Sequence, residues 1–399
     1  MIEGKEWCTG CMACKNICPV QAIGQALDGY GFVVPTVDSD RCTHCGKCEA
    51  VCPLTKMDRE KEKPKEILPL KAYAMYHRSK TVVASSSSGG AFYALSANVL
   101  KRGGIVFGCY YDITQKKAYL ADTDQLPLES LLTSKYVESY IGFGFQKIKS
   151  QLDTGREVLF CGTPCQAAGL CSFLPKEYEN LLVTDFTCGA VSAQVCLSDY
   201  LSSLERRFRS KLTAVQFRDK HYGWGQYCFQ AEFENKKLYR KTAMSDPYFF
   251  CFLRSSMQRL SCHGCLFSAC HFSDLVLSDF WKCDFFDVDR NDRHGISLAL
   301  AMTKKGQQAL EEAREQMHTE ELDVKEAAYN LKIRSCPKEK RQEIFHDQSF
   351  VAKYGVAALR RELLSPRKRL YYAVRQFVMD HPILAAHFPG IVGNGQIMK

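Results

Sequence analysis

Two cysteine runs near the start of the chain constrain its fold more than any other feature. The segments CTGCMACKNICP, residues 8–19, and CTHCGKCEAVCP, residues 42–53, share the spacing C-x2-C-x2-C-x3-C-P. Two-residue gaps let three thiolates wrap one corner of a cubane cluster, and the proline then turns the chain away. We therefore interpret these cysteines as ligands of metal centres.

The repeated run is the one found in bacterial two-cluster ferredoxins, in which the fourth cysteine of each run binds the other cluster. The sequence thus predicts two [4Fe–4S] clusters. A zinc site would normally show CxxC pairs without the third close cysteine and the Cys-Pro. A disulfide scaffold would need an exported chain, which nothing in the sequence indicates. The first cluster is assigned to Cys8, Cys11, Cys14 and Cys52, and the second to Cys42, Cys45, Cys48 and Cys18.

Length and composition place these runs in a larger globular protein. A chain of 399 residues with 46% hydrophobic residues is expected to form two or three domains. The first residues, MIEGKEW, contain no apolar signal segment, and no stretch is long and apolar enough to cross a bilayer. With 21 cysteines, we expect the chain to reside in the reducing cytoplasm.

The formal net charge of +9 does not indicate a nucleic-acid-binding protein. Each oxidised cluster with four thiolates carries about −2, so three clusters lower the net charge to about +3. No basic helix follows either cysteine run, as a nucleic-acid-binding finger would require. We expect no nucleic-acid partner.

The chain is expected to contain four segments. Residues 1–55 form an α+β ferredoxin-like 2[4Fe–4S] module, and residues 56–69 are a charged linker. Strands alternate with helices over residues 70–345, which predicts an α/β mixed-sheet domain covered on both faces. Residues 346–399 are a basic helical tail. The tail is either a packed helix with a solvated basic side or a surface for peripheral membrane or partner contact.

Two turns before helices are candidate ligand sites. The segment CGTPCQAAGL, residues 161–170, joins a buried strand to a helix, where parallel sheets place their ligands. The helix that starts near Cys165 offers free N–H groups to a phosphate or a cluster. The segment SSSSGG, residues 85–90, precedes a helix predicted over residues 91–101. A simple helix cap would also explain either turn.

A further cysteine group lies in the second half, in CHGCLFSAC. Its members Cys262, Cys265 and Cys270 suggest a third iron–sulfur cluster. The fourth ligand would come from a distance, and Cys188, Cys161 and Cys165 compete for that place. A zinc site that uses His263 or His271, or a set of unligated buried thiols, remains the alternative.

Six further segments follow the order seen in the coenzyme F420 hydrogenase/dehydrogenase beta-subunit family. The chain resembles this family from residue 5 to about residue 310, and the N-terminal module makes it similar to the family's bacterial members. Each segment is weak alone, but the ordered set is specific. The segments are SSSSGGAFYALSANVLKRGGIVFG, SKYVESYIG, CGTPCQAAGL, DFTCGAVS, CHGCLFS with SDLVLSDFW, and HGISLALAMTKKG.

The resemblance implies a flavoprotein that binds FAD and a [4Fe–4S] cluster close to it. A cation such as Lys135 would suit the charge of a reduced flavin or of its phosphates. The implied cluster ligands are Cys165, Cys188, Cys262 and Cys265, with Cys270 and Cys161 in reserve. The implied flavin-binding residues are Ser88, Gly89, Gly90, Ser134, Lys135, Tyr136, Gly162, Thr163 and Pro164.

Together these features predict an oxidoreductase that passes electrons from a ferredoxin-like donor, through [4Fe–4S] clusters and a flavin, to a small-molecule substrate by hydride transfer. The alternative is an electron-transfer subunit without a substrate of its own, which serves a partner enzyme. A third interpretation is a structural relative that has lost its flavin. No catalytic acid is assigned, because the family's Cys-His-Gly is replaced here by residues 188–190, CGA. Candidate proton donors, each also explicable as a structural residue, are His77, Asp185, His221 and Asp279.

Overall fold

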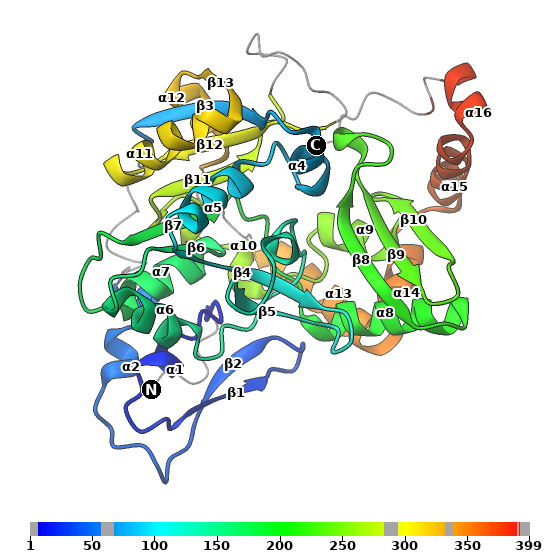
Figure 1. Cartoon of the computed structure of the whole chain (residues 1–399). Helices are drawn as coiled ribbons and strands as arrows, with labels where there is room; N and C mark the ends of the chain where they lie inside the picture. The colour runs from blue at the N-terminus through cyan, green and yellow to red at the C-terminus, as the bar shows by residue number, and fades with distance from the viewer. Residues whose placement is uncertain (1–6, 57–67, 283–293, 332–337, 389–390, 392–399) are drawn as a thin grey trace.

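The chain folds into three parts: an N-terminal module, a central sheet and a second body (Figure 1). The linker expected over residues 56–69 falls almost entirely outside the described residues. The computed structural model describes residues 7–56, 68–282, 294–331, 338–388 and 391.

An eight-stranded mixed sheet forms the centre of the molecule. Its strands are β3 (Lys71–His77), β4 (Ile105–Asp112), β5 (Lys117–Asp122), β6 (Val158–Cys161), β7 (Leu181–Phe186), β11 (Leu275–Asp279), β12 (Ser297–Ala301) and β13 (Met317–Glu321). Their order is β13-β3-β12-β11-β7-β6-β4-β5. The four middle strands β11, β7, β6 and β4 run parallel to one another, and the strands outside them pair antiparallel.

Helices cover both faces of this sheet, as the alternation of strands and helices predicts. They are α5 (Ala91–Lys101), α11 (Lys304–Ala313), α6 (Gly144–Asp153) and α7 (Pro164–Phe173). Within β4, Val106 packs with α5 and α11, whereas Ile105 and Phe107 pack with α6 and α7. Successive strand residues point to opposite faces, so a strand buried on both faces needs the continuous apolar run seen here.

The second body is built on a smaller antiparallel sheet, in the order β10-β9-β8. Its core is rich in aromatic side chains, among them Phe217, Phe229 and Phe249. The three strands follow one another directly in the sequence after residue 210. The elements of this body are α8 (Gln194–Phe208), β8 (Leu212–Asp219), β9 (Cys228–Phe233), β10 (Leu238–Thr242), α9 (Pro247–Leu253), α13 (Lys338–Tyr354) and α14 (Val356–Leu363).

The described end of the chain is helical, and α13 crosses the boundary between residues 345 and 346 at which the sequence predicts that the tail begins. Helices α15 (Pro366–Asp380) and α16 (Pro382–His387) lie at one edge of the molecule (Figure 1). Helix α15 buries Val378 and Met379, but Leu370 is 65% exposed and Phe377 is 56% exposed. The helix is thus packed on one side only. No helix in the described part of the chain is long and apolar enough to cross a membrane.

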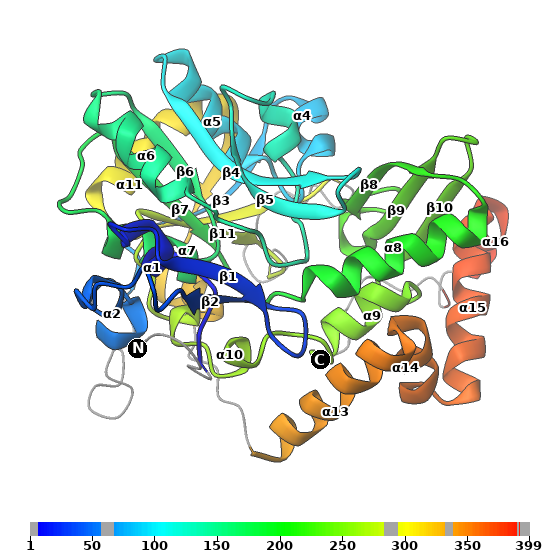
Figure 2. The ribbon, with the colours of Figure 1, turned by 90° about the horizontal axis from the view of Figure 1, so that it is seen from below.

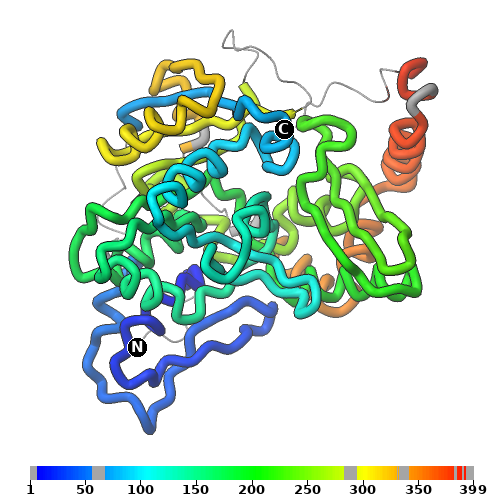
Figure 3. Tube along the Cα trace, in the orientation of Figure 1, coloured from blue at the N-terminus to red at the C-terminus, as the bar shows by residue number. Residues whose placement is uncertain are grey.

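The N-terminal module lies against α6 and α7 of the central part (Figures 2 and 3). Asn16 joins them: its side-chain amide donates to Gly142 O at 3.0 Å, and Gln146 donates to Asn16 O at 2.7 Å. Met12 and Val33 enter the same apolar core as α6 and α7. The module contains α1 (Ala13–Ile17), β1 (Ile23–Leu27), β2 (Val33–Val37), α2 (Lys47–Ala50) and α3 (Pro53–Lys56).

Candidate functional site

The N-terminal cysteines line two separate pockets. The outer pocket is lined by Cys18, Cys42, Cys45 and Cys48. The inner pocket is lined by Cys8, Cys11, Cys14 and Cys52. These are the same two sets of four that the sequence assigns to the two clusters, so the structure brings each set together as the crossed spacing predicts.

Backbone geometry wraps the chain around both pockets. Gly10 and Gly46 each have a φ of +72°, and Met12 and His44 also lie in the left-handed region. Such turns point successive N–H groups inward, where they stabilise sulfur charge. Gly10 N donates to Cys8 Sγ at 3.4 Å.

The cysteines of the two pockets differ in how far they are buried. Cys45 is exposed, and the backbone N–H of Lys47 is the main cause of its lowered pKa. In contrast, burial raises the pKa of Cys14 to about 12, helped by the nearby Cys8 and Cys52 thiols. Cys48 is among the charges that act on Cys14, so the inner and outer sets lie within electrostatic range.

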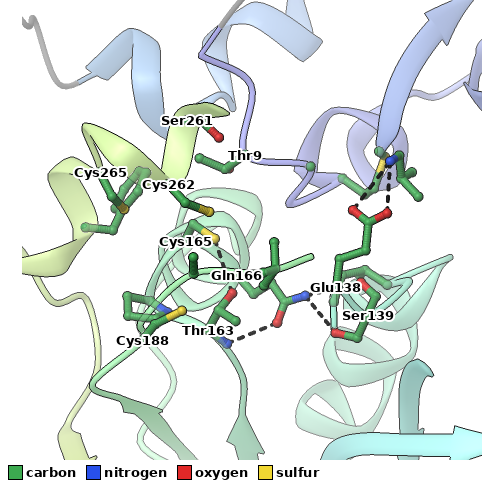
Figure 4. A pocket seen from close by; sticks show the side chains of 18 of the residues that line it. Thr9, Glu138, Ser139, Thr163, Cys165, Gln166, Cys188, Ser261, Cys262 and Cys265 are labelled. Atoms are coloured by element: carbon green, nitrogen blue, oxygen red, sulfur yellow. Dashed lines mark hydrogen bonds between the residues drawn. The ribbon is translucent and has the colours of Figure 1, made fainter. Parts of the chain in front are cut away.

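A third pocket lies at the carboxyl ends of β6 and β7, next to the inner pocket (Figure 4). Four cysteines line it: Cys165 in the first turn of α7, Cys188 after β7, Cys262 on α10 (Leu260–His263), and Cys265. These are the four cysteines that the family resemblance implies. Cys161, Cys270, His263 and His271 do not line it. His271 instead forms a hydrogen bond with Asp185, with 2.8 Å between Nδ1 and Oδ1.

Polar residues add to the third pocket, and of these the sequence analysis names Thr163 but not Gln166, Ser139 or Glu138. Thr163 caps α7, and its hydroxyl lies 3.1 Å from Cys165 Sγ. Gln166 completes this capping box and also donates to Ser139 Oγ at 3.0 Å. Glu138 lines the pocket as well. The spacing of Thr163 and Gln166 is a capping signal that the sequence does carry.

The inner and third pockets adjoin each other through the start of the chain. Thr9 and Met12 line both the inner and the third pocket. A Cβ atom added to Gly169 on α7 would lie 3.0 Å from Cys11 Sγ, so this glycine permits close approach of the inner set. Among the described side chains, no group of three or more His, Cys, Asp or Glu is arranged to hold a single metal ion.

Two of the three flavin-candidate segments contact each other. Ser134 N donates to Ser87 Oγ at 2.7 Å, which joins residues 134–136 to the serine-glycine segment. Gly89 is required there, because a Cβ would lie 2.3 Å from Met75 O. Of the nine candidates, only Thr163 and Pro164 line the third pocket itself.

Lys135 is a partly buried cation between the first flavin-candidate segments and β6. Its Nζ donates to Leu132 O at 2.5 Å and Ser130 O at 3.3 Å. Burial lowers the pKa of Lys135 to about 8, and the thiols of Cys109 and Cys161 offset part of this shift. The β6 cysteine that the sequence held in reserve therefore faces Lys135.

An ion pair between a buried arginine and a partly buried aspartate lies beside the same segments. Arg218 on β8 donates to both carboxylate oxygens of Asp279, at 2.8 and 3.1 Å, and also to Tyr136 Oη at 3.1 Å. Burial alone would lower the pKa of Arg218, but Asp279 raises it above its usual value. Trp224 also donates to Asp279 and stacks on Trp281 with 4.3 Å between ring centroids.

The candidate proton donors are therefore mostly engaged. Asp279 is held by Arg218 and Trp224, and Asp185 by His271. His77 Nδ1 accepts from Ser79 N at 3.0 Å. His221 is exposed on the second body. The structure gathers none of the four at the third pocket.

Comparison with known proteins gives two family matches. Residues 155–327, which hold all four cysteines of the third pocket, match the family described as the C terminus of the beta subunit of coenzyme F420 hydrogenase/dehydrogenase. Residues 7–56 match the 4Fe-4S dicluster domain. No curated protein matches the sequence. A chain of the F420-reducing [NiFe] hydrogenase complex from Methanosarcina barkeri is similar in structure, with a TM-score of 0.45 and 13% identity over 73% of this chain and 94% of that chain.

Proposed function

We propose that the chain is a member of the coenzyme F420 hydrogenase/dehydrogenase beta-subunit family with an N-terminal 4Fe–4S dicluster domain, and that it is an iron–sulfur flavoprotein oxidoreductase. It would take electrons from a ferredoxin-like donor and deliver them to a small-molecule substrate by hydride transfer. The cysteine content supports a reducing, cytoplasmic location.

The observation that carries this proposal is the row of three cysteine pockets. The outer pocket includes the exposed Cys45, and its Cys48 lies within electrostatic range of Cys14 in the inner pocket. The third pocket shares Thr9 and Met12 with the inner one. Sites that adjoin in this way suit the short distances that electron transfer needs. A donor would dock near Cys45.

The cysteines of the three pockets would hold three [4Fe–4S] clusters, in the outer, inner and third positions. When bound, such clusters carry single electrons and FAD exchanges one or two, so a one-electron donor can serve a hydride acceptor. Residues 88–90, 134–136 and 162–164 would hold the FAD. Lys135 places a cation in the second of these segments, and a bound phosphate or reduced flavin would favour its charged form.

Metal and flavin analysis of protein purified without oxygen tests this proposal. We expect about twelve irons and twelve sulfides per chain, from three clusters of four, together with one FAD. The Cys262→Ala variant should lose about four irons. As a matched control, Cys196→Ala removes a thiol on α8 that lines none of the three pockets and should keep all the iron.

Other outcomes separate the alternatives. Eight irons without flavin, even after reconstitution with FAD, would contradict the flavoprotein proposal. Twelve irons without flavin would favour the electron-transfer subunit that serves a partner enzyme. A Cys196→Ala variant that loses as much iron as Cys262→Ala would mean that the third pocket is not the cluster site.

A further inference from the structure

A buried ion pair joins the N-terminal module to the central part of the molecule. Arg259 Nη2 donates to Glu138 Oε2 at 2.5 Å, and both side chains are less than a tenth exposed. Buried ion pairs add little stability relative to apolar packing, because both charges lose their hydration. The position of this pair therefore calls for another explanation than stability.

Both partners bind the module's backbone. Arg259 donates to Val33 O at 2.9 Å and to Cys8 O at 3.3 Å. Glu138 accepts from Val33 N at 3.2 Å, so the pair holds the start of β2 by its carbonyl and its amide. Nearby, Ser261 Oγ also donates to Cys8 O, at 3.1 Å. The pair thus fixes the first cysteine loop against the segment that carries Cys262.

The guanidinium lies between two sets of cysteines. The thiols of Cys8, in the inner pocket, and Cys262, in the third pocket, both raise the pKa of Arg259. The charge of Arg259 in turn partly offsets the effect of burial, which raises the pKa of Cys165 in the third pocket. The charges that act on Glu138, in contrast, are Arg259 and Asp28. The guanidinium therefore interacts with thiols of both pockets, while the Glu138 side chain also lines the third pocket.

Loop geometry shows that the site is built around this side chain. Gly10 has a φ of +72°, and a Cβ added there would lie 2.9 Å from Arg259 Nη2. The ring of Phe32 stacks below the guanidinium, with 4.9 Å from its centroid to Cζ. A lysine in place of Arg259 would keep the charge but could not span Glu138, Val33 and Cys8 with one planar fork.

We propose that Arg259 is a positioning residue for electron transfer: it fixes the separation of the inner and third clusters, and its charge favours the reduced form of both. The inference rests on the proposed function, because it requires clusters in these pockets. A positive charge near a cluster stabilises the additional negative charge that the cluster carries when reduced. Glu138 moderates this effect by neutralising part of the guanidinium charge.

Redox titrations followed by electron paramagnetic resonance test the charge effect. At a fixed potential, Arg259→Gln should lower the ratio of reduced to oxidised inner cluster by about tenfold, as expected for one charge at close range. Glu138→Gln should raise that ratio. Arg259→Lys should leave it near that of the wild type but weaken the magnetic coupling between the inner and third clusters. The outer cluster serves as an internal control and should not respond.

Arg102→Gln is the matched control variant, because Arg102 forms an exposed ion pair with Glu157 away from the pockets. Opposite shifts in Arg259→Gln and Glu138→Gln distinguish electrostatic tuning from mere loosening, which would shift both variants in the same direction. Unchanged ratios in both variants, or shifts of the same sign, would overturn the inference.

The iron content of each sample separates this inference from the proposed function. If the wild type holds about eight irons, the third cluster is disproved, yet the inner cluster still reports on Arg259. If the wild type holds about twelve irons and the inner cluster does not respond, the proposed function stands and the role of Arg259 is wrong.

Discussion

The outer and third pockets are both lined by four cysteines but are assembled in different ways. The outer set falls within residues 18–48 and is shaped by local turns at His44 and Gly46. The third set spans residues 165–265 and meets only because β6 and β7 pair in parallel and α10 packs beside their ends. The outer pocket thus depends on loop geometry, whereas the third depends on the whole central sheet.

The largest effect expected from this comparison is loss of function at the third pocket. Replacing Cys165 and Cys262 together by alanine should reduce electron transfer to a hydride acceptor by more than about 100-fold, since even indirect ligand partners are worth 10–100-fold. Reduction of the two N-terminal clusters by a one-electron donor should persist. Stopped-flow absorbance would follow both steps, and unchanged transfer to the acceptor would contradict the route.

A buried charge in the body tests whether the third pocket depends on global packing. Arg218→Met leaves the partly buried Asp279 without its cation, which should lower the free energy of unfolding by up to about 3–5 kcal/mol. On heating, this variant should release iron from the third pocket before the outer one. Urea unfolding and iron release measure both effects. Arg102→Met, at an exposed pair, should cost less than about 1 kcal/mol.

Lys135 predicts a pH dependence that belongs to the central part. Its pKa is about 8 in the folded protein, against the ordinary lysine value of 10.5 that we take for the unfolded chain. Between these two pH values the unfolded chain therefore binds more protons. The charged form of Lys135 therefore destabilises the folded protein fully below pH 8, and this destabilisation disappears as the pH rises toward 10.5. We therefore compare the free energies of unfolding of Lys135→Met and the wild type. The difference in favour of the variant should be about 3 kcal/mol larger at pH 7 than at pH 10.5. Equal differences in urea unfolding at the two pH values would contradict the shift.

The smallest expected effect lies at the boundary between the module and the sheet. Gly169→Val should destabilise the protein by about 1–3 kcal/mol, because the new side chain would meet Cys11 and Phe145. Gly29→Val, with open space around it in the module, should change stability by less than about 0.5 kcal/mol. Thermal unfolding would compare the two. A neutral Gly169→Val variant would mean that the inner cluster site is not packed against α7.

Much of the fold was predictable from local pattern. The helix expected over residues 91–101 is α5, because a serine-glycine segment precedes it and glycines follow it. The sequence also predicted the mixed sheet covered on both faces. It could not predict the strand order, because a strand's apolar residues do not specify which neighbour will pair with it.

The sequence by itself indicated the two N-terminal sets of cysteines. Three members of each set stand three positions apart and share one loop whatever the rest of the chain does, and the fourth, Cys52 or Cys18, follows from the crossed spacing of the two-cluster run. Only the tertiary structure decided between Cys161, Cys165 and Cys270 for the third pocket. Cys161 lies within β6 and packs toward α5, whereas Cys165 opens α7 at the end of that strand. The pairs Arg259–Glu138 and Arg218–Asp279 were equally hidden, because their partners stand far apart in the sequence and meet only when the sheets are formed.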